Sequence, residues 1–331
     1  MNIRWLSHLS LLTLIVAWIA MGLGAYTRLI DAGLSCPDWP GCYGHLTVPH
    51  SAQTIQEAEH RYPSTPVVQS KAWAEMIHRY IASTLGLLTA IVAFLAVRAA
   101  IHYSAHYWLL GAMLFFCVLA QGMLGLWTVT LQLLPLIVTL HLLGAMTLMA
   151  LLWILHLKSR FTKILSHSPP PSRALSTAAF LGLLLVIAQI ALGAWTSSHW
   201  AALSCPDFPR CQSLARFDIR YVFNLSPFPT ELTQKTIQMA HRFGALIVVL
   251  YWLGFSLWIL TQRTYPPPLK KILYVLLIVL LLQITLGTLN VIQHLPVIVA
   301  IAHNLVAALL LLSVIALIFF MLLQRKYHAH G

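Results

Sequence analysis

The stretch LSCPDWPGC spans Leu34–Cys42, and almost the same nine residues return as LSCPDFPRC at Leu203–Cys211. Both copies are polar and hold two cysteines, although 59% of the 331 residues are hydrophobic. A repeated loop of this kind indicates either a coincidence of loop chemistry or a duplicated chain. The surrounding sequence separates these two interpretations.

Further landmarks follow in the same order in both parts of the chain. The segment EMIHRY in the first part matches QMAHRF in the second, and the offset between matched residues changes only from 169 to 163 and 162. One difference in loop length explains that step, so we predict two similar halves, 1–165 and 166–331. The matched landmarks are Gly24 with Gly193, Cys36 with Cys205, His78 with His241, and His141 with His303.

The composition predicts an integral membrane protein. Only 8% of the residues are charged and the mean hydropathy is +0.80, whereas a soluble domain carries roughly 25% charged residues. Apolar runs long enough to cross about 30 Å of hydrocarbon are continuous instead of alternating, which favours helices over a barrel. We therefore predict an all-α integral membrane protein with eight transmembrane helices arranged as two tandem pseudo-symmetric four-helix bundles. The predicted spans are 9–28, 74–97, 107–129, 135–157, 174–196, 236–260, 270–292 and 296–322.

The distribution of charge predicts the orientation. With both termini in the cytoplasm, the inner segments carry +11 and the outer segments +1 of the net charge of +12, as the positive-inside rule requires. The long cysteine loops, 29–73 and 197–235, are then on the outer side. The first span is kept as a helix, not a signal peptide, because its end returns in the fifth span. The basic excess indicates affinity for anionic lipid, and nothing in the sequence predicts nucleic-acid binding.

Four histidines are predicted to lie at one depth, about 6–10 Å below the outer surface at 1.5 Å per helical residue. An ionisable side chain inside the hydrocarbon is a candidate functional residue, and two facing imidazoles in a helix bundle are typical haem iron ligands. A core histidine bonded to a neighbouring hydroxyl is the alternative, and zinc or copper would need further ligands. The other twelve histidines, among them His156 and His199, are expected to be solvated. The four candidates are His78, His141, His241 and His303.

The residues beside the first histidine of each pair differ between the halves. Glu75 precedes His78 by three residues and shares its helix face, whereas Gln238 holds the matching position in the second half. A carboxylate beside a haem can move protons; an acid favoured by the helix macrodipole is the alternative. Arg79 and Arg242 are expected either to reach lipid headgroups or to pair with haem propionates. We assign the reactive site to the N-terminal half.

The paired cysteines allow two interpretations. Cys36 with Cys42, and Cys205 with Cys211, lie in loops placed outside, where an oxidising compartment favours disulfides. A small rigid loop over each histidine pair is the simpler reading, and a redox role as an electron or thiol relay stays open. Cys117, in the third span, is expected to be a packing residue.

A shorter motif ends three of the odd-numbered spans. Glutamine is followed four residues later by glycine at Gln121–Gly125, Gln189–Gly193 and Gln283–Gly287. Small residues at such positions allow helices to approach closely, and we favour that structural role over a ligand role.

Taken together, the eight spans, the tandem halves, the outer cysteines, EMIHRY and the four histidines resemble the haem A synthase family over nearly the whole chain. The resemblance implies that haem O is oxidised at its C8 methyl, by two successive hydroxylations, to the formyl group of haem A during cytochrome oxidase assembly. It implies that His78 and His141 bind the substrate haem iron beside the essential acid Glu75, and that His241 and His303 hold a haem b cofactor.

The resemblance also suggests partners and a location. Haem O synthase, an electron donor and membrane lipid are the expected partners in a bacterial-type inner membrane, and a homo-oligomer is left open. The rival hypothesis is a non-enzymatic di-haem b electron carrier of the quinol-linked cytochrome b type. Such carriers usually place haems at both membrane faces, whereas all four histidines here are predicted at one face.

Overall fold

The structure is a computed structural model that describes residues 3–161, 171–212, 217–262, 265 and 267–328. These residues form α-helices and one short 3-10 helix, with no strand among them. Eight helices in this part of the chain are long and apolar enough to cross a membrane, which confirms an all-α chain with eight spans. The helices are α1 (Ile3–Leu29), α2 (Ala52–Arg61), α3 (Gln69–Ala100), α4 (His106–Thr130), α5 (Pro135–Arg160), α6 (Arg173–Ser198), η1 (Ile219–Phe223), α7 (Glu231–Thr261), α8 (Pro267–Ile292) and α9 (Val297–His328).

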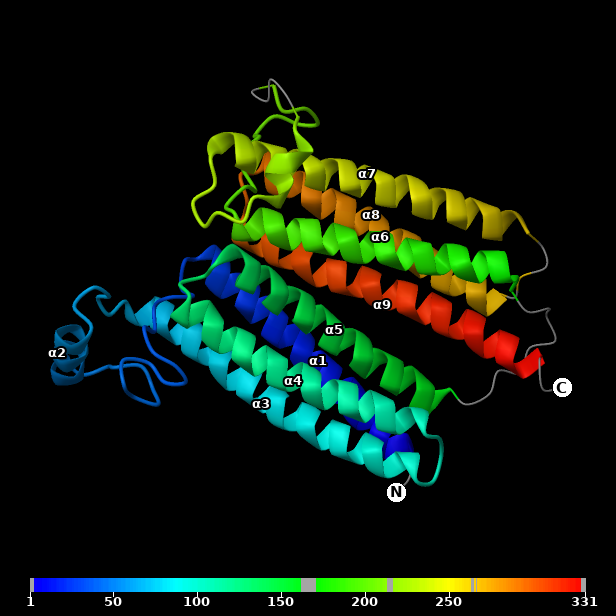
Figure 1. Cartoon of the computed structure of the whole chain (residues 1–331), viewed down its shortest axis with the longest axis horizontal. Coiled ribbons are helices and arrows are strands. Elements are labelled where there is room, and N and C mark those ends of the chain that lie inside the picture. The colour runs from blue at the N-terminus through cyan, green and yellow to red at the C-terminus, as the bar shows by residue number, and fades with distance from the viewer. Residues whose placement is uncertain (1–2, 162–170, 213–216, 263–264, 266, 329–331) are drawn as a thin grey trace.

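The long helices lie in two groups (Figure 1). In the first group, α1, α3, α4 and α5 contact one another in a ring, so that α3 is diagonally opposite α5. In the second group, α6, α7, α8 and α9 form a ring in the same way, with α7 diagonally opposite α9. The predicted boundary between residues 165 and 166 lies outside the described residues.

Helix α9 joins the two groups. It is the most buried of the eight long helices, and it contacts α1 and α5 as well as its neighbours α6 and α8. Two indole N–H groups donate to α9 carbonyls, from Trp18 to Leu305 at 3.4 Å and from Trp153 to Leu312 at 3.0 Å. Because one cluster of buried apolar side chains also runs through both groups, the groups pack as a single body.

The structure adds elements that the apolar pattern did not predict. Helix α2 is polar and begins with a capping box at Ser51 and Thr54, and η1 is only five residues long. Helices α3 and α7 begin at Gln69 and Glu231, about one turn before the predicted spans, and Thr230 caps α7 by accepting from the Thr233 backbone N–H. A search for apolar runs finds neither short elements nor polar first turns.

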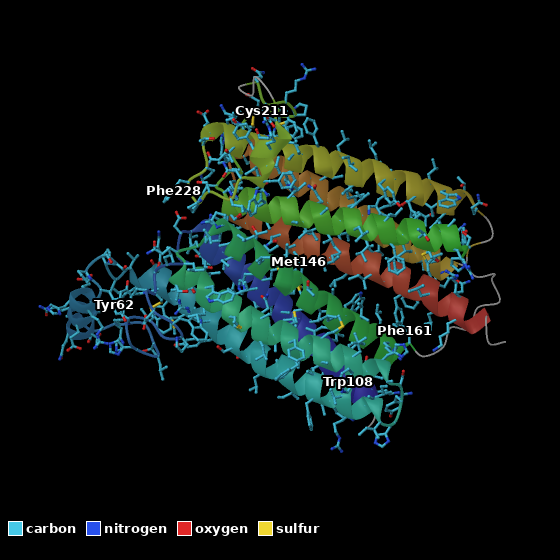
Figure 2. All side chains as sticks on the ribbon, in the orientation of Figure 1. Tyr62, Trp108, Met146, Phe161, Cys211 and Phe228 are labelled. Atoms are coloured by element: carbon cyan, nitrogen blue, oxygen red, sulfur yellow. A yellow bond between two sulfur atoms is a disulfide. The ribbon has the colours of Figure 1, made fainter. Side chains whose placement is uncertain are left out.

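The two ends of the molecule differ. Figure 2 shows Tyr62, Cys211 and Phe228 at one end of the helices, and Trp108 and Phe161 at the other. The first turn of α1 and the last turn of α9 lie at the end that holds Trp108 and Phe161 (Figure 1). Both cysteine loops therefore share one end, opposite the first turn of α1 and the last turn of α9, as the sequence predicted.

Candidate functional site

Each of the four candidate histidines lies against a glycine of the neighbouring helix in its ring. As predicted for the small residues that end these spans, the glycines allow a close approach. A methyl group built on the glycine would reach the imidazole Cε1 in every case; at Gly24, Gly193 and Gly287 it would crowd the ring, whereas at Gly125 it would make an ordinary van der Waals contact. The separations from that methyl are 3.0 Å for Gly24 and His78, 3.7 Å for Gly125 and His141, 3.1 Å for Gly193 and His241, and 2.9 Å for Gly287 and His303.

The histidines are paired across their rings. His78 on α3 and His141 on α5 are close enough for their charged forms to repel each other, and so are His241 on α7 and His303 on α9. In both groups the pair comes from diagonally opposite helices. Imidazoles from opposite helices are directed towards the middle of a four-helix ring, the place where bundle proteins hold cofactors.

The donor set fits haem. Haem iron accepts two neutral imidazole nitrogens from opposite sides, and each ring supplies one such pair. A structural zinc ion takes four ligands; no cluster of three or more histidine, cysteine, aspartate or glutamate side chains that could hold a metal ion occurs in the described part of the chain.

The second nitrogen of the imidazole, Nδ1, distinguishes the two pairs. His241 Nδ1 is 2.9 Å from Gln189 Nε2, and His303 Nδ1 is 3.2 Å from the Gln283 carbonyl oxygen. In the other pair, the Nδ1 atoms of His78 and His141 are buried and have no hydrogen-bond partner among the described residues. The pairs therefore share their place in the ring but differ in the hydrogen bonds made by their imidazole side chains.

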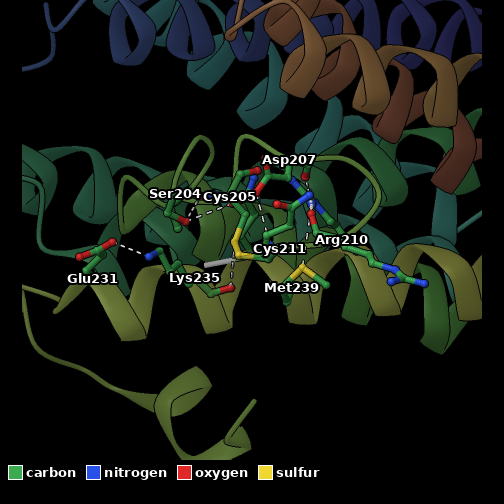
Figure 3. The surroundings of a disulfide bond; sticks show 12 residues. Ser204, Cys205, Asp207, Arg210, Cys211, Glu231, Lys235 and Met239 are labelled. Atoms are coloured by element: carbon green, nitrogen blue, oxygen red, sulfur yellow. Dashed lines mark hydrogen bonds and ion pairs between the residues drawn. A yellow bond between two sulfur atoms is a disulfide. The ribbon is translucent and has the colours of Figure 1, made fainter. Parts of the chain in front are cut away.

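Each cysteine loop is closed by a disulfide, Cys36 with Cys42 and Cys205 with Cys211. Figure 3 shows the second disulfide beside Asp207, Arg210 and Met239, over the first turns of α7. The Trp39-Pro40 and Phe208-Pro209 peptides are cis in both loops. The disulfide reading of the sequence is thus confirmed, and a redox role for these cysteines stays a prediction.

The two arginines bind these loops. Arg79 Nη1 donates to the carbonyls of Gly41 and, at 2.7 Å, Asp38. Arg242 Nη1 donates to the Asp207 carbonyl at 2.7 Å, and its Nη2 donates to Cys205 at 2.5 Å. The sequence did not predict these contacts, which hold each loop over its histidine helix. Pairing with haem propionates stays a prediction.

Glu75 and Gln238 occupy the same helix position but bind different partners. Glu75 is 7% exposed, and its carboxylate accepts from Arg79 Nε at 3.0 Å as a buried ion pair. Gln238 is 3% exposed; its Oε1 accepts from the Cys205 backbone N–H at 2.5 Å, and its Nε2 donates to Ala202 at 2.6 Å. The amide is bound to backbone on both sides, whereas the carboxylate depends on one charged side chain.

Two loop aspartates were missed by the sequence analysis. Asp38 Oδ1 accepts from the Tyr43 backbone N–H at 2.6 Å and Oδ2 from Gly44 at 2.8 Å, while Asp207 Oδ2 accepts from Gln212 at 3.3 Å. Both nonamers carry an aspartate two residues after the first cysteine. That repeated position was the sequence signal that these aspartates bind the backbone of their loops.

Two histidines expected to be solvated are not. His199 is fully buried, with Nδ1 3.0 Å from the Trp195 carbonyl and Nε2 3.2 Å from the Asn224 carbonyl. His156 is half-buried, with Nδ1 2.8 Å from the Ser7 carbonyl. The expectation was wrong because helix ends near the membrane surface are covered here by other segments. Cys117 is a half-buried free cysteine that packs against the core, as predicted.

A helical, multi-pass membrane protein with one histidine pair inside each of two helix rings is the class that the fold and the site define. Residues 7–315 match the family of cytochrome oxidase assembly proteins, and the chain belongs to that family.

Relatives that align with this chain over nearly its whole length share the name haem A synthase. The chain is 38% identical over 334 residues to the haem A synthase of Shewanella oneidensis, with 97% of both chains covered. It is 26% identical to that of Ehrlichia ruminantium, covering 93% of this chain and 91% of the relative, and 28% identical to that of Rickettsia akari, covering 91% and 93%. These relatives give no support to the electron-carrier hypothesis.

Proposed function

We propose that this chain works as a haem A synthase, which oxidises the C8 methyl group of haem O to a formyl group by two successive hydroxylations. The observation that carries the proposal is the paired histidines on diagonally opposite helices, present in both rings of a chain 38% identical to a haem A synthase. An electron carrier also uses such pairs, but it does not need the difference between Glu75 and Gln238.

The two halves divide the work, with residues 1–165 as the substrate half and residues 166–331 as the cofactor half. His78 and His141 bind the iron of haem O, and His241 and His303 bind the iron of a haem b cofactor. When bound, that haem supplies one-electron redox chemistry. The hydrogen-bonded Nδ1 atoms of the second pair support this division, because a resident cofactor needs fixed ligands.

Glu75 is the acid–base residue of the substrate half. Hydroxylation of a methyl group requires protons to be delivered and removed, and the Glu75 carboxylate lies on the helix face of His78, one turn nearer the outer end. Arg79 compensates its charge in a buried ion pair. Protonation of Glu75 would release that pair, so proton uptake and the position of Arg79 are linked.

The arginines also suit haem propionates. A guanidinium binds a carboxylate through parallel N–H groups, and Arg242 Nε is buried and has no partner among the described residues. We assign Arg242 to the propionates of haem b and Arg79 to those of the substrate. Arg242 can use its Nε and keep its loop contacts, whereas Arg79 must give up Glu75 or a loop carbonyl, so propionate binding and the disulfide loops are connected.

In the cell, both chain ends face the cytoplasm of a bacterial-type inner membrane and the disulfide loops face the periplasm. The partners are haem O synthase as the source of substrate, an electron donor, anionic lipid and, in a homo-oligomer, a second copy of the chain. After reduction, an alkylating reagent that cannot cross the membrane should label Cys36 and Cys205 from the periplasmic side. Labelling from the cytoplasmic side alone would reverse the orientation.

The proposed reaction is tested by the haem it makes. Membranes from cells that produce haem O, with and without this chain, are extracted and their haems are separated. Formation of a formyl-bearing haem only with the chain supports the synthase. Unchanged haem O, with haem b bound to the purified protein, supports the electron carrier instead.

A further inference from the structure

We propose that Gln189 is a positioning residue, whose side-chain amide holds His241 as a long-lived haem ligand, and that the absence of such support marks His78 and His141 as the pair from which haem exchanges. The inference rests on the proposed function for the assignment of haem to these pairs. It concerns the hydrogen-bonding of Nδ1, which the iron does not use.

Gln189 is held in a specific place between α6 and α7. Its Nε2 lies 2.9 Å from His241 Nδ1 and donates to the His241 carbonyl at 2.9 Å. A methyl group on Gly244, one turn after the histidine, would overlap the Gln189 amide. The glycine thus makes room for the glutamine, and the glutamine reaches the histidine.

The amide can supply what a ligand histidine needs. An imidazole that binds iron through Nε2 carries its proton on Nδ1 and requires an acceptor there. Gln189 Oε1 is buried and has no partner among the described residues. Turning the amide brings Oε1 to Nδ1, and the side chain must also move Oε1 away from the His241 carbonyl oxygen, which keeps the helical bond of α7. The second ligand, His303, has a backbone acceptor already, the Gln283 carbonyl at 3.2 Å.

The first ring lacks this arrangement at both histidines. Gln121 matches Gln189 in sequence and its amide lies against Gly144, yet His141 Nδ1 is buried without a partner. On α1, the matching residue is Ala20, four residues before Gly24, which has no side-chain amide; its backbone carbonyl lies near the His78 ring, but His78 Nδ1 makes no hydrogen bond to any described residue. A substrate site must release its product, so weakly supported ligands fit its task.

The experiment uses the purified full-length protein with bound haem b. Gln189→Met keeps the length of the side chain and removes its hydrogen bonds, and Gln121→Met makes the same change in the other ring. Loss of support for a metal-bound histidine typically costs 10–100-fold in affinity. We therefore expect Gln189→Met to transfer haem to apomyoglobin roughly 10–100-fold faster than the wild type and to shift the g-values of the low-spin iron. Gln121→Met should change neither.

A second arm tests the first pair. His241→Ala protein, which should keep only the His78 and His141 pair, is loaded with haem b, and its release should be at least roughly 10-fold faster than that of wild-type resident haem. Equal release rates, or wild-type release and g-values in Gln189→Met, would overturn the inference. Retention of resident haem b by His241→Ala would instead overturn the proposed function. If Gln189→Met does not accumulate, Gln189→Asn gives the same test because its shorter amide cannot reach Nδ1.

Discussion

The segments Glu75–Tyr80 of α3 and Gln238–Phe243 of α7 carry nearly the same side chains, and their differences are those that the two proposed tasks require. In both helices an arginine follows the histidine and binds the carbonyls of a disulfide loop. In α3 a second charge, Glu75, is buried against that arginine, whereas in α7 an uncharged amide, Gln238, binds the loop backbone directly. A buried ion pair can change its charge state during a reaction, while an amide bound on both sides stays fixed.

The same contrast extends to the histidines. Nδ1 is hydrogen-bonded in the second ring and unpartnered in the first. At His241 and His303 the second ring partners Nδ1, and at Gln238 it carries an uncharged amide in place of an acid, which is what we expect of a permanent binding site. The first ring combines a buried carboxylate with two histidines whose Nδ1 atoms lack a partner in the described part of the chain, which agrees with the proposed reactive site.

The strongest test of this division removes one ligand at a time. His241→Ala and His303→Ala should abolish haem b in the purified protein, because one imidazole rarely holds a six-coordinate iron. His78→Ala and His141→Ala should keep normal haem b and stop product formation. The haem content per protein, from the spectrum of the pyridine complex, measures both effects. Loss of haem b in the N-terminal variants alone would reverse the assignment of the two rings.

The second test exchanges the acid and the amide. Glu75→Gln should reduce conversion of haem O by roughly 10²-fold or more, the usual scale for loss of a general acid–base group, with normal haem b content. The reverse change, Gln238→Glu, should leave conversion largely unaltered. Haem A formed per bound haem b, in membranes of matched expression, is the measurement. Near-normal conversion by Glu75→Gln would show that this carboxylate is only structural.

The third test compares the arginines. Arg79→Ala leaves the buried Glu75 carboxylate without its counter-charge and should cost about 3–5 kcal/mol of unfolding free energy. Arg242→Ala removes hydrogen bonds to carbonyls without leaving a buried charge, so its cost should be about 1–3 kcal/mol. Denaturant unfolding in detergent measures both. In the Arg79→Ala background, Glu75→Gln should restore part of the loss; no recovery would mean that Arg79 stabilises only the loop.

Much of this molecule could be predicted from its sequence because its signals are periodic and repeated. The eight spans follow from uninterrupted apolar runs, and the four histidines stand out because each pair has a counterpart in the other half. The glycines beside His141, His241 and His303 were visible as the residues that end the Gln121, Gln189 and Gln283 motifs, and Gly24, beside His78, as the counterpart of Gly193. The matched positions of the four histidines in the two halves, more than the residue type alone, identified them as candidates.

The contacts that the sequence did not predict join side chains of one helix to backbone or side chains of another segment. Arg79 binds carbonyls some forty residues away, and no local pattern specifies which carbonyls a guanidinium will meet. His199 was expected to be solvated because it lies near an outer loop; the return of the chain to Asn224, together with Trp195 and Gln234, buries it. The contrast between partnered and unpartnered Nδ1 atoms is also a matter of packing, since Gln121 and Gln189 are alike in sequence.

The smallest expected effect concerns His199, which has Ile30 as its counterpart in the first half. Burial lowers the pKa of His199 from its usual 6.5, against the opposing effect of hydrogen bonds to the Trp195 and Asn224 carbonyls. The unfolded chain therefore takes up this proton at a higher pH than the folded chain. The contribution of neutral His199 to the free energy of unfolding is therefore complete above about pH 6.5 and is lost as the pH falls below that value.

A variant isolates this contribution from those of the other histidines. His199→Gln removes the titratable group, so its apparent Tm should fall less than that of the wild type between pH 8 and pH 5.5. The difference should be a few degrees at most, since about 1 kcal/mol moves Tm by roughly 2–4 °C in a chain of this order of size. Ile30→Gln, at the matched position, should leave the pH dependence as it is in the wild type because it adds and removes no titratable group. Parallel pH profiles for His199→Gln and the wild type would show that the buried imidazole keeps an ordinary pKa. The outer ends of α6 and α1 would then differ in their contacts but not in their response to acid.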